Sequence, residues 1–340
     1  MPFFAGRYEQ KNQLGRGHFG RVWRAMDHHL GIDVALKLLK SGTEIDAATY
    51  EAQRLMQLRG PHVLPVLNAD KYQDIPFVVT YIASAGTAGD KAKGSGVSPA
   101  RAIAWVRDML IGLGVCHDFG LLHRDVKPTN IFLQTEDEAL LGDFGLVAAM
   151  DGAGEAEPQG LWTTRAPELF DGKRATVRSD VYSAGLTLYQ LLTGTDPFWR
   201  ATEAETIAAV KARDFRRIRD VCPHVPRVLA MRIEKAMADD PKDRYQSASA
   251  FHAALGDLPH FPIEWSRAGP HAGHEACWEG THLGHAQDLT VCVTRADGGF
   301  AYETRKAEGA KHRLVASCGI AANETKLAVR LREVFDSLMN

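Results

Sequence analysis

The chain has 340 residues, of which 45% are hydrophobic and 24% are charged, and its formal net charge is −2. This balance is ordinary for a globular protein, and it excludes a strong overall attraction to nucleic acid or to an anionic membrane. Five scattered cysteines without a CxxC pair favour reduced thiols over a disulfide framework. No apolar run approaches the ~20 residues of a membrane helix, and the first residues lack the blocks of a signal peptide. We therefore expect a cytoplasmic protein with no membrane partner.

Residues 8–39 alternate between apolar and polar positions, which predicts strands. Within them, Gly15, Gly17 and Gly20 would let a turn bring backbone N–H groups close to phosphate oxygens. A dinucleotide fold would need a helix directly after these glycines, but residues 21–25 continue as a strand. The glycines therefore belong to a hairpin.

The next strand, residues 33–39, carries Lys37 between apolar neighbours, where an amine without an anionic partner is costly. The alternative is an edge lysine that reaches out to water. Residues 46–58 are predicted to form a helix with Glu51 near its middle, and its default interpretation is an exposed glutamate. Both alternatives stay open on these residues alone.

A further strand is predicted over residues 76–83, and the small, glycine-bearing segment 85–96 that follows indicates a hinge and a loop. Ser98 then caps a long helix that has Pro99 at its first position.

The loop from His123 to Asn130 contains a carboxylate, an amine and an amide at spacings that suit phosphoryl transfer. Asp125 can accept the proton of an attacking hydroxyl, Lys127 can neutralise phosphate charge, and Asn130 can bind a metal ion. Taken alone, such a cluster is more often a solvated turn. The motifs in the rest of the chain decide between the two interpretations.

Five motifs occur in order, and together they resemble the signature of eukaryotic-type (Hanks-type) protein kinases. They are the glycine hairpin, Val34-Ala35-Leu36-Lys37, His123-Arg124-Asp125 with Asn130, Asp143-Phe144-Gly145 and Ala166-Pro167-Glu168. The resemblance covers residues 8–258 and implies an α+β, bilobal fold with a β-rich N-lobe and a helical C-lobe. Lys127 is typical of the serine/threonine branch, and the compact loops suggest a bacterial member.

The resemblance assigns a role to each site residue. Lys37 would bind the ATP phosphates and pair with Glu51, Asp125 would be the catalytic base assisted by Lys127, and Asn130 and Asp143 would bind Mg²⁺. The nucleotide-binding positions would be Gly15, Gly17, Gly20, Val22, Ala35, Lys37, Thr80, Tyr81, Ala83 and Phe132.

The resemblance also implies three interactions outside the nucleotide site. Glu168 would pair with Arg244, and Asp180 would brace the catalytic loop as a structural residue. Arg124 and the Ala166-Pro167-Glu168 segment favour a protein substrate over a small molecule.

The activation segment departs from the family. Leu161 occupies a position where serine/threonine kinases usually have threonine, so either Thr163 or Thr164 bonds to Asp125 and Lys127, or substrate docking is unusual. Residues 146–162 contain no Ser, Thr or Tyr but do contain Asp151, Glu155 and Glu157. We hypothesise that one of these acids pairs with Arg124 in place of a phosphorylated residue. The alternative is that the acids only solvate the loop.

Residues 211–219 are basic but carry a single aromatic residue, so a solvated helix face is favoured over a nucleic-acid site. Residues 259–285 are rich in glycine and histidine and are predicted to be a linker. Their His271, His274, Cys277, His282 and His285 could hold zinc. Glycine-loosened histidines are more often surface residues, and we leave the metal unassigned.

Residues 286–340 are predicted to form a small α+β module of three strands, 289–295, 300–306 and 312–318, and a helix capped by Asn323. From residue 262 on there are 9 Lys and Arg against 10 Asp and Glu, which lacks the basic surface of an RNA-binding module. A docking or regulatory module is favoured.

The expected function is ATP- and Mg²⁺-dependent phosphorylation of protein Ser and Thr hydroxyls. The alternative is a nucleotide-binding scaffold that signals through its C-terminal module without turnover.

Overall fold

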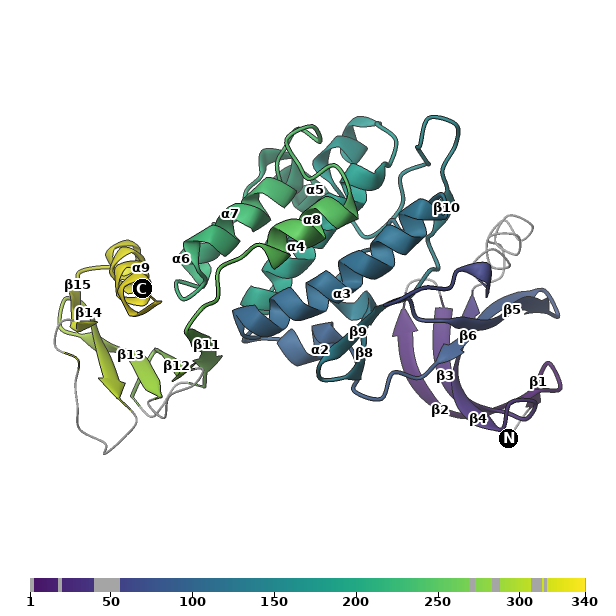
Figure 1. Cartoon of the computed structure of the whole chain (residues 1–340), viewed down its shortest axis with the longest axis horizontal. Helices are drawn as coiled ribbons and strands as arrows, with labels where there is room; N and C mark the ends of the chain where they lie inside the picture. The colour runs from purple at the N-terminus through teal and green to yellow at the C-terminus, as the bar shows by residue number, and fades with distance from the viewer. Residues whose placement is uncertain are drawn as a thin grey trace.

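The computed structural model describes residues 3–17, 20–39, 56–269, 273–282, 288–306, 314 and 317–339 (Figure 1). An antiparallel sheet at the N-terminal end, a group of helices in the middle and a second, smaller sheet with one helix follow one another along the longest axis. The predicted α+β, bilobal fold with a C-terminal module is thereby confirmed. Among the described residues, no helix combines the length and the hydropathy that crossing a bilayer requires.

The N-lobe is a six-stranded sheet with the order β1-β2-β3-β4-β6-β5. Its strands are β1 (Phe3–Phe4), β2 (Tyr8–Gly17), β3 (Gly20–Asp27), β4 (Ile32–Leu39), β5 (Val66–Tyr72) and β6 (Ile75–Tyr81). Val34 and Leu36, two alternate residues of β4, are buried, as the alternating sequence pattern predicts. The predicted helix over 46–58, with Glu51, lies outside the described residues up to position 55.

The C-lobe is built around two long helices, α3 and α4, which pack against each other. Ser98 caps α3 and Pro99 occupies its first turn, as predicted. The helices of this lobe are α2 (Ala88–Ala92), α3 (Pro99–Asp118), α4 (Val177–Thr193), α5 (Glu203–Ala212), α6 (Ile218–Val221), α7 (Arg227–Ala236) and α8 (Ala248–Gly256). Two antiparallel strand pairs lie beside them: β7 (Leu121–Leu122) with β10 (Ala148–Ala149), and β8 (Ile131–Thr135) with β9 (Glu138–Leu141).

The C-terminal module is a five-stranded antiparallel sheet, β11 to β15 in order, with one face packed on α9. Its elements are β11 (Ile263–Ala268), β12 (Ala276–His282), β13 (Leu289–Ala296), β14 (Gly299–Lys306), β15 (Gly319–Ala321) and α9 (Glu324–Met339). Trp265 and Trp278 pack edge-on against Phe335 in a hydrophobic core separate from that of the C-lobe. This separate core makes the module a unit of its own.

The structure corrects two predictions for this region. The segment 259–285 is not simply a linker, because β11 and β12 fall within it. Its many glycines and histidines obscure the apolar pattern by which strands are predicted from sequence. The strand predicted over 312–318 is also wrong where the structure describes that range, since the last strand is β15 at Gly319–Ala321. The predicted helix cap is confirmed, because Asn323 Oδ1 accepts a hydrogen bond from Lys326 N at 2.9 Å.

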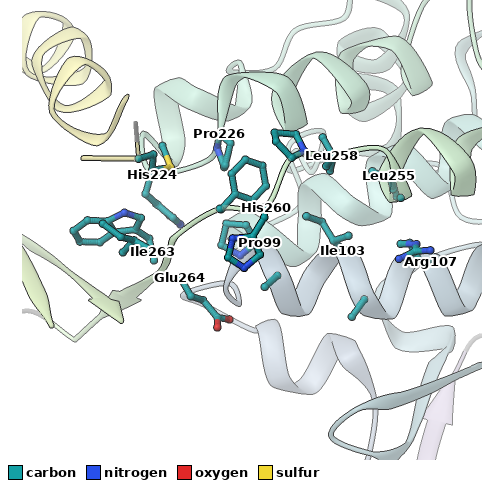
Figure 2. A pocket seen from close by; sticks show the side chains of 17 residues that line it. Pro99, Ile103, Arg107, His224, Pro226, Leu255, Leu258, His260, Ile263 and Glu264 are labelled. Atoms are coloured by element: carbon teal, nitrogen blue, oxygen red, sulfur yellow. The ribbon is translucent and has the colours of Figure 1, made fainter. Parts of the chain in front are cut away.

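The module docks on the end of the C-lobe farthest from the N-lobe sheet (Figure 1). Arg219 of α6 pairs with Asp336 of α9 at 2.6 Å, and Arg332 of α9 pairs with Asp220. His224 lies in this contact against the rings of Trp278 and Phe335. Beside it is a hollow of about 320 Å³, into which side chains from α3, the α8–β11 connection and β11 project (Figure 2).

Candidate active site

A cleft of about 330 Å³ lies between the N-lobe sheet and the C-lobe. The structure brings most of the sequence-predicted nucleotide positions to this one cleft: Gly15, Val22, Ala35, Lys37, Thr80, Tyr81, Ala83, Phe132 and Asp143. Strands β3, β4 and β6 supply one wall and β8 supplies Phe132 on the other. Apolar side chains make up most of the cleft lining, and the charged pair Lys37–Asp143 lies among them, which suits a ring joined to a polyphosphate.

The glycine hairpin closes over the edge of this cleft. Gly17 and Gly20 are paired residues at the ends of β2 and β3, and the two residues between them lie outside the described part of the chain. A Cβ atom at Gly20 would lie 1.9 Å from the backbone oxygen of Leu38. Only glycine therefore allows β3 and β4 to approach this closely.

Lys37 reaches from β4 across the cleft and forms an ion pair with Asp143. Both side chains are partly exposed there, but because Lys37 is paired with Asp143 it does not simply extend to water. Burial alone would raise the pKa of Asp143, but the charge and hydrogen bond of Lys37, with Lys127 and His123 nearby, lower it. Asp143 is thus held as a carboxylate at neutral pH. Glu51, the predicted partner of Lys37, lies outside the described residues.

The catalytic-loop candidates converge as a hydrogen-bonded group. Lys127 Nζ lies 2.7 Å from Asp125 Oδ2, and Asn130 Nδ2 donates to Asp125 Oδ2 at 3.0 Å and to its backbone oxygen at 2.8 Å. Asp125 Oδ1 is buried and has no hydrogen-bond partner among the described residues. One carboxylate oxygen is therefore fixed by neighbours, and the other remains available as an acceptor.

Asp180, buried on α4, binds the backbone of this loop. Its carboxylate accepts hydrogen bonds from the backbone N–H groups of His123 and Arg124, each at 2.9 Å, and lies 2.9 Å from His117 Nε2. Burial raises the pKa of Asp180, but the bonds from His117 and His123 outweigh this and lower it. The bracing contact predicted for Asp180 is present, and His117 is an additional partner that no sequence motif indicated.

Arg124 contacts the activation segment through backbone oxygens. Its Nε donates to the oxygen of Leu146 at 2.6 Å and its Nη1 to that of Glu157 at 2.7 Å. We hypothesise from the sequence that one of three acids, Asp151, Glu155 or Glu157, pairs with Arg124. In the structure all three form ion pairs with another cation, Arg174, which lies shortly before α4. The acids therefore do more than solvate the loop, since Arg174 ties them to the C-lobe.

Thr163 and Thr164 are both buried. Thr164 Oγ1 donates to the oxygen of Leu161 at 3.2 Å, and Thr163 lies beside the partly buried carboxylate of Asp196. Within the described residues neither hydroxyl bonds to Asp125 or Lys127, which bond to each other instead. Half-exposed Leu161 lines a groove with Lys127, Asp90 and Asp196. Of the two alternatives for this segment, an unusual docking surface agrees better with the structure.

Comparison with known proteins decides the family. Residues 8–255 match the model of the protein kinase domain. The chain belongs to the protein kinase family. It is 32% identical to serine/threonine-protein kinase PknB of Mycolicibacterium smegmatis over 268 residues, which are 73% of this chain and 42% of that protein. It is 33% identical to serine/threonine-protein kinase PknD of Mycobacterium tuberculosis over 317 residues, which are 90% of this chain and 46% of that protein.

This kinase chain thus spans less than half the length of these curated relatives. Both relatives are bacterial serine/threonine-protein kinases by name, as the sequence resemblance predicts. The match to the kinase family covers the N-lobe, the cleft and the C-lobe and stops before β11.

Proposed function

We propose that the chain is an ATP-dependent protein kinase that transfers the γ-phosphoryl group to Ser and Thr hydroxyls of proteins. The observation that carries the proposal is the Lys37–Asp143 ion pair in an apolar-walled cleft, beside the hydrogen-bonded group of the catalytic loop. Lys127, which bonds to Asp125, is close enough to lower the pKa of Asp143, and the backbone oxygen of Asn130 accepts a hydrogen bond from Gly142 N. The names of the mycobacterial relatives support the Ser/Thr specificity.

In this proposal Asp125 Oδ1 accepts the proton of the attacking hydroxyl while Lys127 and Asn130 fix the other carboxylate oxygen. Lys37 binds phosphate oxygens, and Gly15, Gly17 and Gly20 offer backbone N–H groups above them. Val22, Ala35 and Phe132 enclose the adenine ring, and Thr80, Tyr81 and Ala83 form its polar edge. Glu51 would be the second anionic partner of Lys37.

The oxygen donors of the site fit Mg²⁺, which prefers hard oxygen ligands. Asn130 uses its Nδ2 group on Asp125, so its Oδ1 atom remains for a cation, and Asp143 is held ionised. Asn130 and Asp143 would hold the ion. Mg²⁺ would neutralise charge on the phosphates during transfer.

The test compares the full chain with its Asp125→Asn variant, using labelled ATP, Mg²⁺ and a mixture of Ser-, Thr- and Tyr-containing peptides. Loss of the base is expected to slow transfer by about 10²- to 10⁴-fold, with label only on Ser and Thr. Nucleotide binding that persists in the wild-type protein without any transfer would instead support the scaffold alternative. Label on tyrosine would contradict the Ser/Thr assignment.

We also propose that the C-terminal module binds a protein partner or substrate. Ile320 lies 75% exposed on β15, and β15 is an edge strand of the sheet, whose unpaired backbone groups can pair with a strand of another chain. Ile320→Glu is expected to weaken phosphorylation of a protein substrate and to leave that of a short peptide unchanged. Equal loss with both substrates would argue against docking through β15.

A further inference from the structure

The outer face of the C-terminal sheet, the one turned away from α9, carries a row of side chains that can ligate a metal. Cys277 of β12 is the direct cross-strand partner of Cys292 of β13, and Cys292 is in turn the partner of Glu303 of β14. Side chains alternate between the faces of a strand, and the neighbours of Cys292, Val291 and Val293, are buried on the core side. The two thiols therefore lie side by side on the other face.

His274 joins the thiols from the turn that leads into β12. The following residue, Glu275, is fixed to the sheet because its N–H donates to the oxygen of Val293 at 2.8 Å. His274 Nδ1 lies 3.3 Å from Cys277 Sγ. The ligand atoms of His274, Cys277 and Cys292 all lie within 4.8 Å of one another, and Cys277 is fully buried.

These separations can be compared with those of a bound ion. A tetrahedral Zn²⁺ with Zn–S bonds of about 2.3 Å and Zn–N bonds of about 2.0 Å places its ligand atoms about 3.5–3.8 Å apart. The three atoms are thus already gathered near the required spacing on two hydrogen-bonded strands. We propose that His274, Cys277 and Cys292 bind one zinc ion on the outer face of the C-terminal module.

The ligand types select zinc over the cation of the active site. Two thiolates and an imidazole are soft ligands that favour Zn²⁺, whereas Mg²⁺ requires oxygen ligands in octahedral geometry. The fourth position has room for water, because a hollow of about 230 Å³ adjoins the cluster. This hollow is lined by His274, Cys292, Thr290, Thr294, Glu303 and Arg305.

The site differs from the one that composition suggested. His282 lies at the far end of β12, paired with Ile263 of β11, and is not part of the cluster. His271 and His285 lie outside the described residues. Cys292, distant from the other two in sequence, completes the cluster only through strand pairing.

The experiment measures zinc in the full chain purified under reducing conditions, supplied with Zn²⁺ alone and then dialysed. Wild type is expected to retain about one zinc per chain, and Cys277→Ser, Cys292→Ser and His274→Ala are expected to retain less than about a tenth of that. Cys318→Ser is the matched control, because Cys318 belongs to the same module but not to the cluster. It should bind zinc like wild type.

Cobalt substitution gives a readout that does not depend on the folding of the variants. Co²⁺ added to the wild-type chain should produce a thiolate-to-metal charge-transfer band that one equivalent of Zn²⁺ abolishes. Absence of stoichiometric zinc and of this band would overturn the proposal, as would full zinc retention by the Cys292→Ser variant. A chain isolated with Cys277 and Cys292 joined in a disulfide even when reductant and Zn²⁺ are present would also overturn it.

Discussion

The guanidinium of Arg244 forms a two-pronged, buried ion pair with the carboxylate of Glu168. Nη1 lies 2.8 Å from Oε1 and Nη2 lies 2.7 Å from Oε2, and the Arg244 side chain is completely buried. Arg244 also donates to the backbone oxygen of Ala238 and lies over the ring of Tyr182. The pair that the family resemblance implied is confirmed, and it connects the end of the activation segment to the loop before α8.

Replacing only one member of this pair should destabilise the C-lobe. Arg244→Met leaves the Glu168 carboxylate buried without its counter-charge, so we expect a loss of about 3–5 kcal/mol in the free energy of unfolding. Urea denaturation followed by fluorescence measures this. The double variant Arg244→Met with Glu168→Leu removes both charges and should recover part of the loss. A single variant as stable as wild type would contradict the prediction.

Acid should weaken the fold through His224. Burial, with the charge of Arg267, lowers the pKa of His224 to about 3, while an unfolded histidine titrates near 6.5. The unfolded chain therefore binds the extra proton first, so stability is complete above about pH 6.5 and falls by about 1.4 kcal/mol per pH unit below it. At pH 5 the loss should be about 2 kcal/mol.

The matched variant for this effect is His224→Phe, which keeps an aromatic ring against Trp278 and Phe335. Its melting temperature should fall less than that of wild type between pH 7.5 and pH 5. Parallel falls in the two proteins would show that other groups dominate the acid response.

The rate of peptide phosphorylation should depend on Arg174, which binds the three acids of the activation segment. Each of its three ion pairs is solvent-accessible and individually weak, but together they fix the loop on one cation. Arg174→Gln should lower peptide phosphorylation, and the activity of wild type should fall more steeply with salt than that of the variant. Lys173→Gln, at the neighbouring position, is the control. Equal activity of the two variants would exclude a role for the cluster.

Gly20 should be intolerant of a side chain. A methyl group there meets the backbone oxygen of Leu38, so the hairpin must shift away from β4, at a strain of about 1–3 kcal/mol. Gly20→Ala is expected to raise the KM for ATP by about tenfold. At Gly15 an added Cβ has no atom within 4 Å, so Gly15→Ala should have a smaller effect. Steady-state kinetics with varied ATP compares them.

The active site could be predicted closely because its chemistry restricts residue type and order together. Lys37, Asp125 and Asp143 are recognisable at family spacings, and the structure places Lys37 and Asp143 in one cleft as an ion pair. The partner of the loop acids could not be predicted, because Arg174 is one cation among many and its position depends on how the segment folds back. The same limit applies to Cys292, which approaches Cys277 only through the β12–β13 register.

The C-terminal module was harder to predict for another reason. In β12 both Cys277 and Trp278 are buried, although they point to opposite faces, so the apolar and polar residues do not alternate cleanly. Strand predictions depend on that alternation. β13 and β14 alternate well and meet at the tight turn of Gly298, and both were found.

The length of α3 sets the shortest distance that a substrate bound at the C-terminal module must span to the catalytic loop. Ser98, at its start, bonds to Glu264 of β11, whereas its last turn places His117 beside Asp180 under the catalytic loop. Twenty residues of helix measure about 30 Å. A polypeptide anchored near β11 therefore needs about nine extended residues between its anchor and its phosphorylated hydroxyl. Shorter tethers would hold their Ser or Thr out of range, so spacing along the substrate chain becomes a selection criterion in its own right.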